Sequence, residues 1–536
     1  MNFLRAEEPR MRTDLFQPLK EQMALVEKYQ FSATWLLQYD AMVEGPFVEF
    51  LKSEMPADHE VGIWFEMNRR ICDDAGIAWR GIPGWEWDFH VPVAYSIGYT
   101  PAERRRLADC AMATFRRVFG RDAKTIACWN LDAFSMEHFS TRYNVDAFAV
   151  VRDQLSTDGY TVWGAPIAGY YPSRKNAWSP ALEIENQIAT PVFRLLGQDP
   201  VYYYDNTVPN PDTMEPVWNS GQSDIFVEHF LDMIARGPSQ SFAYAQLGQE
   251  NSFGWPMMRK GYQMQMAKLS AIRKTGGFRV ETIGETGRRF KRAFSSTPAQ
   301  AQVMLQDPLG RTEAPERTVW YQSKCFRANL HFRKEQFYLR DLHVYNDRFA
   351  EPYLADVVRQ HGIEQRMLAV LDGYHWSDDE IHAGRAGMRA MGRFVLLDKD
   401  GRETELATAA PPAVSEGASI LRVAVPLTSG GTLDLAFKER EIIFSLSGLP
   451  SQARLALIFQ WIPERGAFQS VVGDRLHYRF RNFDYFVRAV NGSASKVADG
   501  ARIVSHASNG FRLQMAQDAA AKGNRPDRAS TETVSS

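Results

Sequence analysis

The pattern of apolar residues changes once along the chain, and this change constrains the fold more than any other feature. From Phe31 to about residue 310, short apolar runs alternate with helix-length amphipathic segments. From about Arg317, short strands of alternating apolar and polar residues follow one another, separated by turns rich in Gly, Ser and Asp. The first pattern is typical of parallel strands covered by helices, and the second of antiparallel sheets. The sequence therefore predicts an α/β domain followed by an all-β domain.

The first part contains seven candidate strands and several candidate helices. A capping box of Thr100 and Glu103 opens a helix that ends at Gly120, and Thr282 with Glu285 predicts a second such start. The expected strands span residues 31–39, 60–65, 87–95, 124–129, 160–163, 201–204 and 242–245, and further helices are expected near 145–155, 225–236 and 257–274. Seven or eight such units predict an α/β barrel, either an incomplete (β/α)7 or a (β/α)8 barrel. A doubly wound sheet is disfavoured, because no G-x-G-x-x-G follows a strand.

These patterns divide the chain into four segments. We expect an N-terminal extension over 1–24, a β/α barrel catalytic domain over 25–310 and a β-sandwich domain over 315–515. The tail, 516–536, is almost free of large apolar residues and is expected to be disordered.

Charge and composition exclude several classes of partner. The 62 basic and 64 acidic residues nearly cancel and form no block of one sign, which argues against a nucleic-acid or anionic-membrane surface. The chain has no run of about 18 apolar residues that could span a membrane and no signal-peptide pattern near Met1. The four cysteines form no C-x-x-C pair. We therefore expect a cytoplasmic protein, with a leader removed before this numbering left open as an alternative.

Acidic residues follow several of the expected strands. Asp132 follows the strand at 124–129 within Cys128-Trp129-Asn130-Leu131-Asp132, and Glu250 follows the strand at 242–245. Asp40 and Glu66 end the first two strands. Barrel enzymes hold their chemistry at the carboxyl ends of the strands, so all four are candidate catalytic residues. The alternative for Asp132, Asp40 and Glu66 is a purely structural role at the start of the following helix.

Two carboxylates on opposite walls of a barrel mouth are the minimum for glycoside hydrolysis. One acts as a nucleophile or base and the other, held protonated, as the acid. We assign these roles to Asp132 and Glu250. Tryptophans near the strand ends could provide stacking surfaces for sugar rings. The candidate substrate-binding residues are Trp64, Trp87, Asp88, His90, Trp129, His59 and Trp255.

Metal chemistry is the rival possibility. Asp88 and His90 lie on one face of an extended segment and could bind a divalent metal with His59, although a sugar-binding or structural role is the stronger interpretation. Neither G-x-S-x-G nor H-E-x-x-H is present, so serine-hydrolase and zincin chemistry lose support. No organic cofactor is expected.

The order of several motifs resembles the polysaccharide deacetylase and glycoside hydrolase family 38 and 57 superfamily. The motifs are Leu36-Leu37-Gln38-Tyr39-Asp40, His59-Glu60-Val61-Gly62-Ile63, Phe119-Gly120, a strand with an acidic end, and Asp158-Gly159-Tyr160. The chain also resembles a bacterial family that joins such a barrel to a β-sandwich, in which Tyr338-Leu339-Arg340-Asp341-Leu342 is typical of the junction.

The resemblance implies a (β/α)7 barrel that acts on a glycan. In the family 57 pattern, the nucleophile ends strand four and the acid/base ends strand seven, which are the positions of Asp132 and Glu250. The nucleophile of that family is usually Glu, so Asp132 departs from the pattern. Deacetylases of the superfamily use an Asp-Asp pair and His-x-x-x-His, whereas this chain has a single Asp40 and a lone His59. We expect a glycoside hydrolase with a carbohydrate substrate; a metal-dependent deacetylase or mannosidase-like enzyme and a non-catalytic carbohydrate-binding protein are the alternatives.

Overall fold

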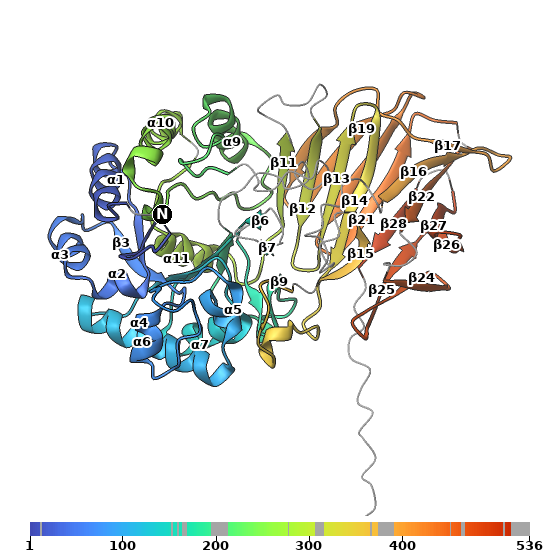
Figure 1. Ribbon diagram of the computed structural model, residues 1–536. Helices are drawn as coiled ribbons and strands as arrows, with labels where there is room; N and C mark the ends of the chain where they lie inside the picture. Colours follow the sequence, from blue (N-terminus) through green and yellow to red (C-terminus); the bar gives the residue numbers. More distant parts are fainter. Residues whose placement is uncertain are drawn as a thin grey trace, which may run out of the picture.

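In a computed structural model, the chain forms an α/β domain followed by an all-β domain (Figure 1). The structure describes residues 1–10, 13–151, 154–157, 160–162, 169–194, 213–276, 278–305, 316–364, 367–373, 391–450, 452–461, 467–507 and 510–515. The expected strand at 201–204 and the expected disordered tail, 516–536, lie outside these residues.

A six-stranded parallel sheet forms the centre of the first domain. Its strands, in spatial order, are β1 (Asn2–Leu4), β2 (Thr34–Leu37), β3 (Glu60–Trp64), β4 (Thr125–Ala127), β5 (Ala147–Val150) and β10 (Val192–Arg194). An isolated parallel bridge joins Phe3 of β1 to Glu250, so the segment that ends at Glu250 lies beside the edge strand β1. All six carboxyl ends therefore meet at one side of the sheet.

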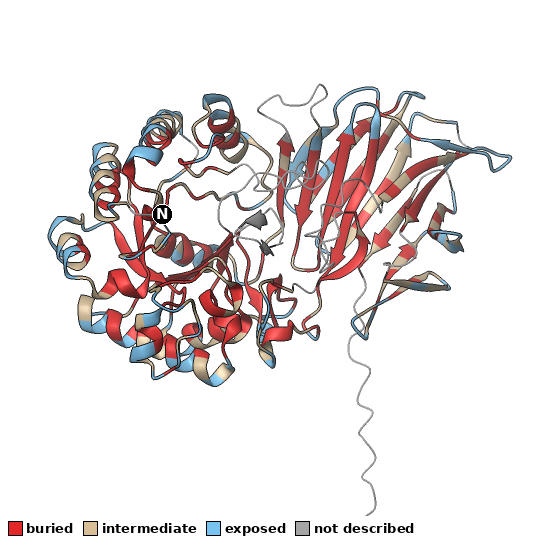
Figure 2. Cartoon of the chain, in the orientation of Figure 1, coloured by how far each residue is buried: buried red, intermediate tan, exposed pale blue. Residues whose placement is uncertain are grey.

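The two faces of the sheet bury different side chains. Phe3, Leu36, Trp64 and Ala127 form one apolar cluster on one face, whereas Leu4, Leu37 and Ile63 pack with the helices on the other. This division follows from the two-residue period of a strand. Because both faces are buried, the strands are almost continuously apolar (Figure 2).

Helices surround this sheet (Figure 1). They are α1 (Phe16–Lys28), α2 (Tyr39–Val43), α3 (Gly45–Glu54), α4 (Arg69–Asp74), α5 (Val91–Ala94), α6 (Pro101–Phe119), α7 (Ala133–Tyr143), α9 (Asp224–Arg236), α10 (Trp255–Lys274) and α11 (Ile283–Ala293). The capping box before α6 is confirmed, and the helix ends at Gly120, which adopts the left-handed conformation that glycine tolerates. Thr282 caps α11 through the N–H of Glu285. The helices expected near 225–236 and 257–274 are also confirmed, as α9 and α10.

Five expectations for this domain differ from the structure. Residues 87–95 form a loop and the short helix α5 instead of a strand, and the helix expected near 145–155 is replaced by β5. Tyr160–Val162 is β7, which pairs with β6 (Gln154–Thr157) in a separate antiparallel hairpin, and residues 242–245 form no strand. The segment 1–24, expected to be an extension, supplies the edge strand β1.

The second domain consists of two large antiparallel sheets. The ten-stranded sheet contains β11 (Gln300–Leu305), β12 (Arg317–Gln322), β13 (Phe326–Arg333), β14 (Gln336–Val344), β15 (Leu368–Asp372), β16 (Met391–Leu397), β17 (Glu403–Glu405), β22 (Arg454–Gln460), β26 (Gly492–Val497) and β27 (Gly500–Ser505). The eight-stranded sheet contains β18 (Ala413–Gly417), β19 (Ile420–Pro426), β20 (Thr432–Lys438), β21 (Glu441–Ser447), β23 (Phe468–Val472), β24 (Arg475–Phe480), β25 (Phe483–Val490) and β28 (Phe511–Gln514).

One apolar core joins the two sheets. Leu339 and Phe394 from the first sheet pack in the same cluster as Leu421 and Phe444 from the second. The first sheet begins at Gln300, so the change to antiparallel structure precedes the boundary expected at 310–315.

Candidate functional site

Three glutamates converge on one arginine at the carboxyl ends of the parallel strands. Arg5 Nη1 lies 3.1 Å from Glu8 Oε2, and Arg5 Nη2 lies 3.5 Å from Glu66 Oε2 and 3.3 Å from Glu250 Oε2. Arg5, Glu8 and Glu66 are buried. Arg5, Glu8, Glu66 and Glu250 are called the Arg5 cluster below.

The fold brings Arg5, Glu66 and Glu250 together from two strand ends and a segment that lies beside β1. Arg5 directly follows β1, Glu66 lies two residues after β3, and Glu250 lies beside β1 through its bridge to Phe3. Asn251 fixes the register of these segments, because its side chain accepts the N–H of Arg5 at 3.0 Å and donates to the carbonyl of Arg5 at 2.7 Å. Sequence analysis identified Glu66 and Glu250 but missed Arg5, Glu8 and Asn251.

The charges in the Arg5 cluster do not balance when every carboxyl group is ionised. Arg5 faces three carboxylates, and Arg10 pairs with Glu8, with Nε 3.1 Å from Oε1. Burial raises the pKa of Glu250 to about 7, and the positive charge of Arg5 only partly offsets this effect. Glu250, whose side chain is 14% exposed, can therefore hold a proton near neutral pH.

Asp40 serves the same region through backbone contacts. Its Oδ2 accepts the N–H groups of Ala6 and Glu7 at 3.0 and 2.9 Å, and its Oδ1 accepts the N–H of Ala41 at 2.8 Å. Burial raises the pKa of Asp40 to about 6 in spite of these bonds. Asp40 thus holds the loop that follows Arg5, and its contacts match the structural alternative.

Three of the predicted tryptophans lie near the Arg5 cluster. Trp64 donates its indole N–H to Glu66 Oε2 at 2.9 Å, and its ring meets that of Trp129 edge-on at 5.0 Å. The Trp87 ring lies 3.9 Å from the guanidinium carbon of Arg5, within the range of a cation–π contact. The site therefore combines carboxyl groups with aromatic rings.

Asp132 lies in a different environment. Its Oδ1 accepts Arg104 Nη1 at 3.1 Å and the N–H of Ser135 at 3.0 Å, and its Oδ2 accepts the hydroxyls of Ser96 and Ser135 at 2.6 and 2.7 Å. Asp132 is the N-cap of α7, and both it and Arg104 are fully buried. These contacts match the capping alternative, so we correct the assignment of Asp132 as nucleophile or base.

A carboxyl group from the second domain reaches the same end of α7. Glu351 accepts the N–H of Ala133 at 2.9 Å through Oε1 and the N–H of Ala177 at 2.9 Å through Oε2. Burial, together with the nearby charge of Asp132, raises the pKa of Glu351 to about 8. This contact ties the two domains together at a site that sequence analysis did not detect.

The predicted metal ligands do not come together. His59 precedes β3 and bonds Trp35 Nε1 and the carbonyl of Phe31, whereas Asp88 and His90 lie in a loop near the opposite end of that strand. His90 Nδ1 lies 2.6 Å from Asp88 Oδ1, and its side chain is 41% exposed. The expectation of a shared site with His59 is therefore wrong. Trp255 is buried at the start of α10 and packs edge-on against Tyr262.

Among the described residues, a different group has spacing that could suit a metal ion: Asp341, His343 and Asp372, in the second domain. Arg327 already compensates this group, with Nε 3.1 Å from Asp341 Oδ1 and Nη2 3.3 Å from His343 Nδ1. We assign it a structural role in the sheet.

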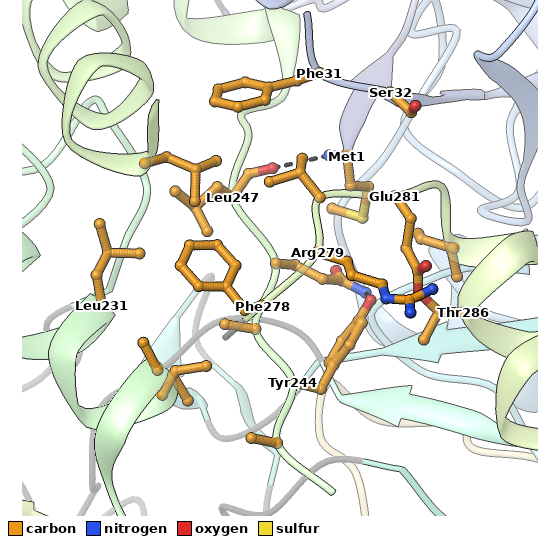
Figure 3. A pocket seen from close by; sticks show the side chains of 18 of the residues that line it. Met1, Phe31, Ser32, Leu231, Tyr244, Leu247, Phe278, Arg279, Glu281 and Thr286 are labelled. Carbon is orange, nitrogen blue, oxygen red and sulfur yellow. Dashed lines mark hydrogen bonds between the residues drawn. The ribbon is translucent and has the colours of Figure 1, made fainter. Parts of the chain in front are cut away.

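The first domain also contains a cavity of about 410 Å³ near the amino ends of β1 and β2. Figure 3 shows apolar side chains, including Phe31, Leu231 and Phe278, on one side, and Tyr244, Arg279 and Glu281 on the other. No member of the Arg5 cluster lines it. The cavity is therefore distinct from the candidate site.

The raised pKa values predict how stability depends on pH. Asp40, Glu250 and Glu351 each bind a proton more tightly in the folded chain than in the unfolded chain. Such groups stabilise the fold when protonated, and this stabilisation is lost as the pH rises through the folded pKa. The free energy of unfolding should therefore fall between about pH 5 and about pH 8 in urea titrations followed by tryptophan fluorescence. A rise over this range would contradict the assignment, and Glu250→Gln should reduce the slope.

The comparisons with known proteins give a limited likeness. No protein-family model and no curated protein matches the sequence. A candidate glycoside hydrolase/deacetylase from Parabacteroides distasonis is 15% identical, with a TM-score of 0.49, and the match covers 65% of this chain and 82% of that chain. A candidate polysaccharide deacetylase from Mycobacterium smegmatis is 8% identical, with a TM-score of 0.32, and the match covers 51% of this chain and 77% of that chain.

None of the helices among the described residues combines the length and the apolar character that crossing a membrane requires.

Proposed function

We propose that this protein hydrolyses a glycosidic bond at the Arg5 cluster, with Glu250 as the general acid and Glu66 as the nucleophile or base. The observation that carries the proposal is the shared contact of Glu66 and Glu250 with Arg5 Nη2 at the carboxyl ends of the strands. Two carboxyl groups thus lie side by side, as the reaction requires, and burial raises the pKa of one of them, Glu250, to about 7.

The spacing of the two carboxyl groups fits this chemistry. Glu66 Oε2 lies 3.5 Å and Glu250 Oε2 3.3 Å from the same nitrogen, so the two oxygens are at most 6.8 Å apart. Retaining glycosidases separate their carboxyls by about 5–5.5 Å and inverting enzymes by about 6.5–9.5 Å. The upper limit of 6.8 Å on the distance between the two oxygens favours the retaining reaction. In that reaction Glu66 attacks the anomeric carbon while Glu250 protonates the leaving oxygen.

The surrounding residues support the same roles. The Trp64 indole fixes one oxygen of Glu66, and burial keeps Glu250 protonated near neutral pH. Trp129, which is only partly buried, would offer a face on which a sugar ring can stack. We also propose that the sheet closes into an incomplete barrel through the segment that ends at Glu250, because this segment already pairs with β1.

A non-catalytic carbohydrate-binding protein is the second candidate. It is favoured by one observation, the contact of Arg5 with both carboxyl groups, because binding requires no free acid. The two candidates differ in whether the sugar is cleaved.

Incubation with a panel of neutral oligosaccharides, read by mass spectrometry, tests the proposal. Hydrolysis should produce two shorter glycans, and activity should survive a chelator. Loss of acetyl groups from an acetylated glycan, abolished by the chelator, would instead support a metal-dependent deacetylase. Binding without any change in glycan mass would support the non-catalytic candidate.

A further inference from the structure

Gln38, the residue after β2, has an unsatisfied side-chain amide. It is fully buried, and neither Oε1 nor Nε2 has a hydrogen-bond partner within the part of the chain that the structure describes. It is the N-cap residue of α2, yet its side chain makes no capping bond. Leaving buried polar atoms unpaired destabilises a fold, and native proteins do so rarely. A role in binding a ligand would explain why this amide is present.

The position of Gln38 in the sheet places this amide beside Arg5. β1 and β2 pair Leu4 with Leu37, and the N–H of Gln38 donates to the carbonyl of Leu4 at 2.9 Å. Arg5 and Gln38 directly follow that pair, on adjacent strands that lie about 4.8 Å apart. Strand alternation puts both side chains on the face of Phe3 and Leu36, and the Arg5 guanidinium carbon does lie over the Phe3 ring at 4.6 Å.

Trp87 adds a second unsatisfied group at the same place. Its ring lies against Arg5, and its buried indole Nε1 has no hydrogen-bond partner among the described residues. Asn130, which follows β4 on the other side of β3, is also fully buried with both amide atoms unpaired. Unpaired donors and acceptors therefore concentrate near the strand ends that carry Glu66 and Glu250.

We propose that Gln38 and Trp87 bind hydroxyl groups of an uncharged sugar in this site; the inference rests on the proposed function and specifies its substrate class. A hydroxyl group can both donate and accept a hydrogen bond. Two sugar hydroxyls could therefore pair with the oxygen and the nitrogen of the Gln38 amide, and a third hydroxyl could accept the N–H of Trp87. With Glu250 protonated, two carboxyl groups, Glu8 and Glu66, face the two arginines, Arg5 and Arg10. These residues then carry no excess positive charge that would bind an anionic sugar, so a neutral sugar is preferred.

Gln38→Met tests the inference, with Gln265→Met as the matched control. Gln265 is also a buried glutamine, but its Nε2 donates to the carbonyls of Met214 and Gly221 at 2.8 and 2.7 Å. Without ligand, Gln38→Met should raise the melting temperature. The methionine side chain has a similar volume to that of glutamine but leaves no polar atom unpaired. Gln265→Met should lower the melting temperature, because it leaves two carbonyls unpaired. Trp87→Phe, which keeps the ring over Arg5, is a second variant at the site.

Isothermal titration calorimetry with mannohexaose, cellohexaose, maltohexaose and hexagalacturonate provides the binding readout. At least one neutral hexasaccharide should bind, and its affinity should fall about tenfold or more in Gln38→Met and Trp87→Phe but not in Gln265→Met. Hexagalacturonate should bind more weakly than the neutral sugars. The inference is overturned if no neutral hexasaccharide binds, if hexagalacturonate binds best, if both site variants bind like the wild type, or if Gln38→Met loses as much thermal stability as Gln265→Met.

These outcomes are separable from those of the proposed function. Sugar binding that depends on Gln38 without any cleavage would support this inference and contradict hydrolysis. Cleavage that is unchanged in Gln38→Met and Trp87→Phe would support hydrolysis and contradict this inference.

Discussion

Glu250→Gln is expected to lower kcat for an unactivated oligosaccharide by about 10²–10⁴-fold, the scale of lost general acid catalysis. The glutamine amide cannot deliver a proton to the leaving oxygen, although it keeps nearly the same size and can remain beside Arg5. Glu66→Gln should lower kcat at least as much, because it removes the attacking carboxylate. Rates on the glycan identified by mass spectrometry, with circular dichroism as a control for folding, measure both effects.

The leaving group separates the two roles. The 4-nitrophenolate of a 4-nitrophenyl glycoside leaves without protonation, so kcat/KM of Glu250→Gln on that substrate should approach the wild-type value, whereas kcat/KM of Glu66→Gln should not. Equal losses of activity on both substrates in both variants would contradict the separate roles. Rates near wild type for both variants would remove the Arg5 cluster as the catalytic site.

Asp132→Ala is expected to destabilise the protein by about 3–5 kcal/mol, because it leaves the fully buried Arg104 without its carboxylate. The change also removes the cap of α7, which contributes about 1 kcal/mol. Urea denaturation monitored by tryptophan fluorescence gives the free energy of unfolding. If Asp132 is structural, kcat per folded molecule should change far less than in Glu250→Gln.

Thr100→Ala is the matched control for this prediction. Thr100 caps α6 through the N–H of Glu103 at an exposed position, without a buried arginine. Loss of this cap should lower the free energy of unfolding by about 1 kcal/mol. The additional loss of stability in Asp132→Ala then measures the contact with Arg104. Equal losses of stability, combined with abolished hydrolysis in Asp132→Ala alone, would restore Asp132 as a catalytic residue.

The sequence was sufficient to predict that Asp40, Glu66 and Asp132 follow strands, but not what each one contacts. The short apolar runs before Asp40 and Glu66 are β2 and β3. Asp132 follows β4 in the same way, yet its partner Arg104 comes from α6, a helix whose position relative to the loop depends on tertiary packing. An acid that caps a helix and an acid that performs catalysis can therefore share one local sequence pattern.

The centre of the site was missed for a similar reason. β1 has only three residues, which is too short for a recognisable period, so Arg5 appeared to belong to a terminal extension. The helix expected at 145–155 was wrong because Ala147–Val150 is a buried apolar run, and periodicity alone cannot distinguish a short buried strand from part of a helix. The unpaired amide of Gln38 is likewise invisible in sequence, since hydrogen-bond satisfaction depends on the assembled sheet.

The pH dependence of kcat/KM, in wild type and in Glu250→Gln, tests the catalytic pair most directly. The account predicts that wild-type activity falls above a pKa of about 7, as Glu250 loses the proton that it donates. It also predicts that this falling limb is absent from the residual activity of Glu250→Gln. An identical falling limb in both proteins would contradict the assignment of Glu250 as the acid.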